Sequence, residues 1–254
     1  MSRNNGNRDP DDEIATPEIP NFLQMSTQTL LEEFGAGRHK PGSGSAAALL
    51  GLLACKMMQT VITVTHRNSQ YAANFSQLNL VDTAIKSKYD PFFRDAVQRD
   101  SAQFDRYHRA IQAKKSCTEP SELRRLTDKA REELRPATEI PLEIARHALE
   151  ISERGLVVYD LGARHARGDS GVAISAALSA CSGALFVVYL NLSRFREGQW
   201  ALATRTSADE IKMRSQELQH EQFRRVSRIQ AEGIEQSQQE LPLQLEFPDE
   251  DSPT

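Results

Sequence analysis

A single carboxylate interrupts an apolar helix face near the middle of the chain. Six residues follow one another at spacings of 4, 3, 4, 3 and 4, which is the repeat of one side of an α-helix. They are Phe93, Val97, Asp100, Phe104, Tyr107 and Ile111. An ionised carboxylate facing a core is costly unless it is paired or hydrogen-bonded. Asp100 therefore has two interpretations: an acid at the wall of a binding cleft, or a structural carboxylate paired with one of the arginines.

A glycine-containing loop precedes a long apolar segment, at residues 41–48. Free N–H groups and the helix dipole make such a helix start a site for anions, and the basic residues 38–40 could add positive charge. The alternative is an ordinary turn in which a serine caps the helix. No Gly-Lys-Ser/Thr follows, so the loop is not a P-loop. The candidate positions are Gly42, Ser43, Gly44 and Ser45.

A second carboxylate, Asp169, stands just before the other long apolar segment. Aspartate is favoured at the N-cap of a helix, and this is the structural interpretation. The functional alternative makes Asp169 a second carboxylate at the same end of the helical core as Asp100.

Helices are the elements that must position these residues, because helical periodicity dominates the chain and strand-like alternation is nearly absent. We expect an all-α fold, a multi-helix bundle around two buried helices rich in small residues, at 45–64 and 170–192. The other expected helices cover 23–34, 78–113 with Pro91 as a break or first-turn residue, 120–134, 142–154 after Pro136 and Pro141, and 208–237.

One of the two apolar segments also has the length of a membrane span. Residues 171–192 carry no charge, and about 20 apolar residues cross a bilayer. Against a span, this segment holds three serines and Asn191, and nothing else in the chain looks membranous. We predict a packed central helix, no membrane partner, and recovery of the protein in the supernatant without detergent.

Composition excludes several further classes. The chain has 31 Lys and Arg against 35 Asp and Glu, a net charge of -4, which argues against a nucleic-acid partner. Its three cysteines are far apart with no CxxC spacing, and no HExxH pair is present. We therefore expect no metal site and no disulfide framework. No apolar signal segment opens the chain, and we expect a cytoplasmic protein.

The two ends differ in composition from the rest. Residues 1–20 are polar and contain three prolines, and residues 242–254 are acidic. Both are predicted to be disordered tails. One helical domain is expected between them, at residues 21–241.

Taken in order, these stretches resemble the cyclodeaminase/cyclohydrolase family of tetrahydrofolate one-carbon enzymes. The resemblance covers roughly residues 30–192. Its motifs are a short helix, a glycine-serine-alanine loop, an Asp-x-x-x-Phe helix, a proline-containing helix start, and an Asp-x-Gly-Val-Ala helix ending in Asn-Leu. Here they fall at residues 29–34, 41–48, 100–104, 137–145, 168–173 and 191–192.

Several positions depart from the family pattern. Ser43 replaces a glycine, Gly168 replaces a serine, and Val187 replaces an asparagine. Residues 68–70 lack the usual basic run, and residues 112–115 lack an LPK-like stretch. These changes leave open an alternative, a catalytically altered or inactive member used for ligand binding or self-association.

The resemblance implies a function, a substrate and site residues. Family members either close N5-formimidoyl-tetrahydrofolate to the 5,10-methenyl form with release of ammonia, or add water to the methenyl bridge. Neither reaction needs a metal or a redox cofactor, so a tetrahydrofolate derivative is the small molecule expected, and the family implies a homodimer. Asp100 is the expected acid/base catalyst. The expected substrate-binding residues are Gly42, Ser43, Gly44, Ser45, Asp169 and Asn191.

Overall fold

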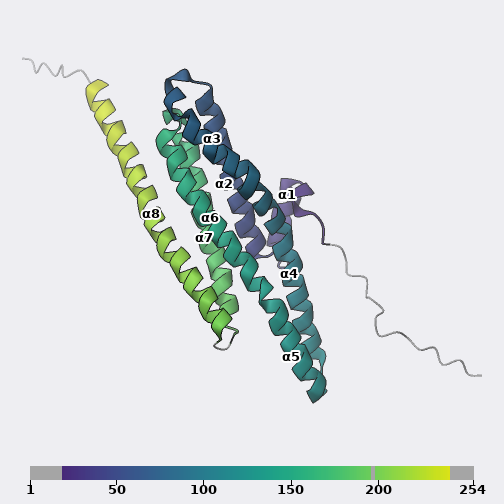
Figure 1. Cartoon of the computed structure of the whole chain (residues 1–254). Coiled ribbons are helices and arrows are strands. Elements are labelled where there is room, and N and C mark those ends of the chain that lie inside the picture. Colours follow the sequence, from purple (N-terminus) through teal and green to yellow (C-terminus); the bar gives the residue numbers. More distant parts are fainter. Residues whose placement is uncertain (1–18, 196–197, 241–254) are drawn as a thin grey trace, which may run out of the picture.

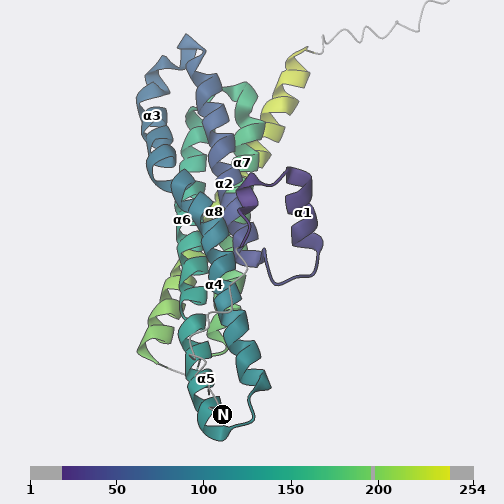
Figure 2. The same ribbon diagram turned by 90° about the vertical axis from the view of Figure 1, so that its right-hand side faces the viewer.

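The computed structural model describes residues 19–195 and 198–240, and every regular element within these ranges is helical (Figures 1 and 2). The all-α prediction is confirmed. The predicted disordered tails, apart from residues 19 and 20, lie outside the described residues. The α-helices are α1 (Thr27–Gly35), α2 (Ser43–His66), α3 (Phe75–Ala84), α4 (Asp90–Ser116), α5 (Pro120–Leu134), α6 (Pro136–Leu161), α7 (Arg167–Leu192) and α8 (Gln199–Glu240).

Helices α2 and α7 form the middle of the bundle and run antiparallel. At one end, the backbone N–H of Ala163, just before α7, donates to Thr65 Oγ1 near the end of α2 at 2.9 Å. At the other end, a Cβ atom on Gly183 of α7 would lie 3.8 Å from the Cβ of Ala47 near the start of α2. The start of α2 therefore lies beside the end of α7.

Small residues let the central helices approach their neighbours closely. Ala47, Ala54, Ala177 and Ala180 are at most 2% exposed. A Cβ atom on Gly51 of α2 would overlap with the ring of Phe93 on α4. Real Cβ atoms do not approach other atoms this closely, so only glycine allows the ring to pack against the backbone of α2 here. The prediction of a small-residue helix pair at the centre is confirmed.

Burial of the two central helices is less complete than their composition suggested. Both are long and apolar enough to cross a membrane by length and composition, yet 50% of the most apolar window of α2 and 56% of that of α7 are buried inside the bundle. The remaining part includes large exposed apolar side chains. They are Leu50 and Leu53 on α2, and Val172, Phe186 and Leu190 on α7.

Helix α6 begins earlier than the periodicity predicted, at Pro136 rather than near residue 142, and Pro141 lies inside it. Pro91 occupies the first turn of α4, directly after a π-helical turn at Ile85–Tyr89. Of the two options for Pro91, the first-turn position is the one observed.

Among the described side chains of the last helix, α8, the buried apolar ones lie in its first half, while its second half contacts α6 and α7 through ion pairs such as Arg225–Asp160 and Arg167–Glu232. Ile211 and Leu218 are buried in the first half. The apolar stripe then continues without cover, because Phe223, Val226, Ile229 and Ile234 are all exposed. Figure 1 shows α8 diverging from the bundle toward its C-terminal end.

Candidate functional site

Asp100 lies on α4 and points at the N-terminus of α2. Its side chain is buried, with 7% of the residue exposed. Ser45 Oγ lies 3.1 Å from Asp100 Oδ2, and the backbone N–H of Ser45 also donates to this carboxylate. The same hydroxyl is 2.8 Å from the carbonyl oxygen of Val97 and 2.8 Å from Ser101 Oγ. Asp100 and the glycine-containing loop before α2, which the sequence suggested separately, therefore form one site. The Asp100 carboxylate is the anion bound at the start of α2.

Gly44 makes this arrangement sterically possible. A Cβ atom at this position would lie 2.7 Å from Asp100 Oδ2 and would overlap with the rest of the carboxylate. Gly42 is the N-cap of α2 and makes no side-chain capping bond, while Ser43 is the first helical residue and is exposed. The alternative interpretation, in which Ser43 or Ser45 caps the helix, is wrong, because Gly42 is the N-cap and Asp100 of α4 accepts the bond that a cap would accept.

The environment of Asp100 favours its protonated form. Burial raises the pKa of Asp100 to about 6, while the hydroxyl and the backbone amide of Ser45 act in the opposite direction. Among the described residues, no Lys, Arg or His forms an ion pair with Asp100, so the arginine-paired interpretation is not what the fold contains. A carboxyl group that titrates near neutral pH is suited to general acid–base catalysis.

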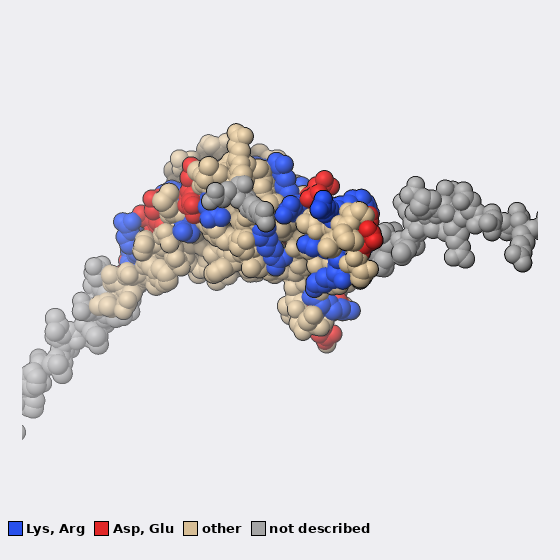
Figure 3. All heavy atoms as spheres, turned by 90° about the horizontal axis from the view of Figure 1, so that it is seen from below, with Lys and Arg blue, Asp and Glu red and all other residues tan. Residues whose placement is uncertain are grey.

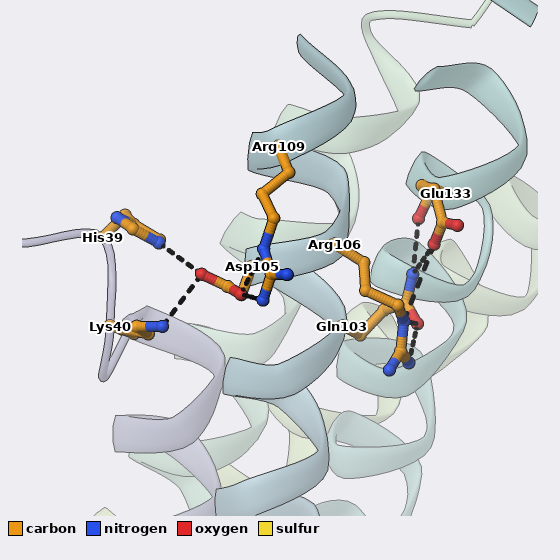
Figure 4. Close-up of polar contacts among 7 residues, drawn as sticks. All are labelled: His39, Lys40, Gln103, Asp105, Arg106, Arg109 and Glu133. Carbon is orange, nitrogen blue, oxygen red and sulfur yellow. Dashed lines mark hydrogen bonds and ion pairs between the residues drawn. The ribbon is translucent and has the colours of Figure 1, made fainter. Parts of the chain in front are cut away.

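A second buried carboxylate, Asp105, fixes the loop that leads into α2 (Figure 4). It accepts hydrogen bonds from His39 Nε2 at 2.8 Å, Lys40 Nζ at 3.0 Å and Arg109 Nε at 2.8 Å. Although burial raises the pKa of Asp105, the bonds from His39, Arg109 and Lys40 hold it well below its usual range. The basic residues of this loop are thus paired, since Arg38 also binds Glu33.

Sequence reasoning missed Asp105. Its i,i+4 spacing to Arg109 predicts a helix-surface pair, but His39 and Lys40 are 66 and 65 residues away along the chain. Figure 4 also shows Gln103 on the same helix, whose amide donates to the backbone oxygen of Glu133 at 2.9 Å and so ties α4 to α5.

Asn191 lies at the end of α7, at the same end of the bundle as the start of α2. Its side-chain amide makes a structural hydrogen bond to α6. Its Nδ2 donates to the carbonyl oxygen of Ala137 at 2.9 Å, and the residue is 3% exposed. Pro141 has no N–H, so the helix itself cannot satisfy that i−4 carbonyl. The Asn191 amide replaces the missing donor. Asn191 therefore has a structural role, and its role in substrate binding stays a prediction.

We expect Asn191→Leu to lower the free energy of unfolding by about 1–3 kcal/mol, because it leaves the Ala137 carbonyl buried without a donor. In a Pro141→Ala background the same change should cost less, since residue 141 then donates its own N–H. Urea denaturation of the four proteins in this cycle measures the coupling. Equal costs in both backgrounds would show that the two residues act independently.

Asp169 lies far from Asp100 within one chain. It is exposed in the first turn of α7, whose N-cap is Ala166, so the N-cap interpretation is wrong by three residues. Because α2 and α7 are antiparallel, the start of α7 lies beside Thr65. At 1.5 Å per residue, roughly 30 Å of helix separates Thr65 from Ser45. The expectation that Asp169 and Asp100 share one end of the core is wrong for a single chain.

Comparison with known proteins shows a likeness over the region that holds these residues. A family model described as formiminotransferase-cyclodeaminase matches residues 26–210. A methenyltetrahydrofolate cyclohydrolase from Methylorubrum extorquens is 25% identical over 167 residues, which cover 65% of this chain and 77% of that protein.

A solved structure shows the same fold. The crystal structure of formiminotetrahydrofolate cyclodeaminase from Thermotoga maritima matches with a TM-score of 0.71 and 14% sequence identity, over 82% of this chain and 98% of the other. The helical architecture, the buried Asp100 at the start of α2 and the match over residues 26–210 agree with one another. The chain belongs to the formiminotransferase-cyclodeaminase family.

Proposed function

We propose that this protein is a cytoplasmic enzyme that acts on the one-carbon bridge between N5 and N10 of tetrahydrofolate, as a methenyltetrahydrofolate cyclohydrolase or a formimidoyltetrahydrofolate cyclodeaminase. The observation that carries the proposal is the Asp100 carboxyl group, buried beside Ser45 with a pKa of about 6, inside the region matched by the family model. The activities named for the relatives supply the substrate class.

Asp100 has the same task in either reaction. In the cyclohydrolase reaction, the ionised carboxylate takes a proton from the water that attacks the methenyl carbon, and then returns it to N5 as the N5–carbon bond breaks. The remaining hydroxyl proton is released to solvent as the formyl C=O forms. In the cyclodeaminase reaction, the carboxylate takes the proton of N10 as this nitrogen attacks the carbon of the cationic formimidoyl group. It then protonates the amino group, which leaves as ammonia and gives the methenyl cation. Both cycles return Asp100 to its starting state. Ser45 orients the carboxylate through its hydroxyl and its amide.

Two assays on the purified protein distinguish the reactions. Loss of methenyltetrahydrofolate absorbance, above the rate of its spontaneous hydrolysis, identifies the cyclohydrolase. Release of ammonia from the formimidoyl form identifies the cyclodeaminase. Activity in neither assay would reject the proposal.

The alternative is a non-catalytic member used for ligand binding or self-association. One observation favours it: four cavities lie elsewhere on the described part of the chain, three of them along the contact between α7 and α8, and Asp100 lines none of these four. The departures at Ser43, Gly168 and Val187 agree with this alternative. Saturable binding of a folate without turnover would support it.

We also propose that the protein is a homodimer and that the exposed side of α2 and α7 forms the interface. Phe186 is 78% exposed on a helix without charge from residue 170 to 192. In Figure 3, much of the lower edge of the molecule carries neither basic nor acidic side chains. Two copies related by a twofold axis would bury this surface without bringing like charges together.

Analytical ultracentrifugation at micromolar concentration is expected to give a dimer. Phe186→Glu should give a monomer, because it places a carboxylate in the middle of the interface. Leu80→Glu is the matched control, since Leu80 is 70% exposed but lies on α3. A wild-type monomer, or equal effects of the two variants, would count against this interface.

A further inference from the structure

An arginine-rich cavity lies at the end of the bundle opposite to Asp100. It has a volume of about 480 Å³ and is formed by the turn after α2, the connection between α6 and α7, and the second half of α8. Five of its ten lining residues are arginines and one is acidic. The arginines are Arg164, Arg167, Arg224, Arg225 and Arg228, and the acid is Asp160.

The positive charge of this cavity is only partly neutralised. Four of the five guanidinium groups, those of Arg167, Arg224, Arg225 and Arg228, form ion pairs with the three carboxylates of Asp160, Glu221 and Glu232. Five positive charges against three negative charges leave a local excess of two. Arg164 has no ion pair among the described residues, and its backbone N–H donates to the Tyr71 hydroxyl at 3.1 Å.

Arg225 and Arg167 are held in place by acidic partners and by the ring of Tyr159. Arg225 makes two bonds to Asp160, with Nε 3.1 Å from Oδ1 and one terminal nitrogen 2.5 Å from Oδ2. Arg167 is paired with Glu232 at 2.7 Å, and both guanidinium groups lie over the ring of Tyr159. Their side chains are 19% and 16% exposed. The Nε atom of Arg167 is buried and has no partner among the described residues.

The positive charge of the cavity also affects the phenol of Tyr71, which lines it. Its pKa is lowered first by the hydrogen bond from the backbone of Arg164, and further by the charges of Arg164 and Arg167.

Fixed guanidinium groups with remaining donors match the paired oxygens of phosphates and carboxylates. The cavity volume is within the range of small-molecule sites, and the net negative charge of the chain argues against a nucleic acid.

We propose that this cavity is a binding site for a small polyanion, a phosphate ester or a polycarboxylate, that bridges Arg164 and Arg228 in the cavity that Arg167 and Arg225 also line. The site is separate from Asp100 and does not depend on the folate reaction. Arg164 and Arg228 are both exposed; Arg164 forms no ion pair among the described residues, and Arg228 forms one exposed ion pair, with Glu232.

Isothermal titration calorimetry on the full-length protein tests the site with two probes, inorganic pyrophosphate and citrate. We expect saturable binding of at least one probe. The double variant Arg164→Gln/Arg228→Gln should weaken it by at least about tenfold, because charge-assisted hydrogen bonds are lost. The matched control is Arg125→Gln/Arg131→Gln, which removes the same charge from exposed, ion-paired arginines on α5.

The pattern of results decides the proposal. Tighter binding of pyrophosphate identifies a phosphate site, and tighter binding of citrate identifies a polycarboxylate site. Absence of saturable binding of both probes at millimolar concentration would overturn the proposal, as would an equal loss in the control. Thermal melts of each variant establish that it is folded.

Discussion

Asp100→Asn is expected to lower turnover by about 10²–10⁴-fold, the usual contribution of a general acid–base group, while leaving the protein at least as stable as the wild type at pH 8. Asparagine has nearly the shape of the protonated acid, so it keeps the contacts to Ser45 and the packing of α4. Because no cation pairs with Asp100 among the described residues, the substitution leaves no buried charge without a partner.

The pH dependence of this variant has a definite sign. Burial raises the folded-state pKa of Asp100 to about 6, above an unfolded-state value of about 3.9. The folded state therefore favours the protonated acid, and the ionised group lowers the free energy of unfolding progressively as pH rises from about 4 to about 6. The stability advantage of Asp100→Asn should be absent below pH 4 and complete above pH 6.

Turnover and urea denaturation between pH 4 and pH 8 measure both effects. Asp95→Asn is the matched control, because Asp95 lies on the same helix with its side chain 64% exposed. A folded Asp100→Asn protein with unchanged turnover would remove Asp100 from the mechanism. A marked loss of stability at pH 8 would indicate an ion-pair partner.

Gly51→Ala and Gly183→Ala are expected to change stability in opposite directions. At Gly51, the new methyl group would overlap with the ring of Phe93, which is completely buried. Moving a packed ring or separating α2 from α4 should cost about 1–3 kcal/mol. At Gly183, the nearest atom is the Cβ of Ala47 at 3.8 Å, an ordinary contact. Replacing this helical glycine should therefore stabilise the protein by about 0.4–1 kcal/mol.

Urea denaturation of the two variants provides the comparison, with the wild type as reference. Because both replacements add one methyl group to a central helix, differences in helix propensity cancel between them. Changes of the same sign and size would show that the close contact between α2 and α4 does not limit the packing of the bundle.

Local patterns predicted those features that depend on local sequence. Helix α5 spans Pro120–Leu134, as its charged amphipathic repeat between two prolines indicated. Asp100 was found from its spacing on an apolar face. Its partner could not be found in this way, because Ser45 is 55 residues away in sequence. The sequence offered many arginines as partners, and the fold instead uses a helix N-terminus.

Features that depend on distant contacts were the ones mispredicted. Pro141 was expected to precede the helix, but α6 begins at Pro136 and continues through it, and the amide of Asn191, on another helix, donates to the carbonyl that Pro141 cannot serve. Asp169 was considered as a second carboxylate near Asp100, because it stands at the start of an apolar helix and Asp100 lies on an apolar helix face. The direction of α7 relative to α2 separates them, and this direction is set by the connections between helices rather than by any local pattern.

The capping of α2 by a residue of α4 has a consequence for how the chain folds. The first turn of α2 has no capping side chain of its own, since Gly42 makes no such bond, and its acceptor comes from Asp100, which must first be brought into place by the docking of α4. A helix start without a cap frays. The amide hydrogens of this turn should therefore exchange with solvent whenever α4 separates from α2. Their exchange rates would report the opening of this helix pair separately from global unfolding.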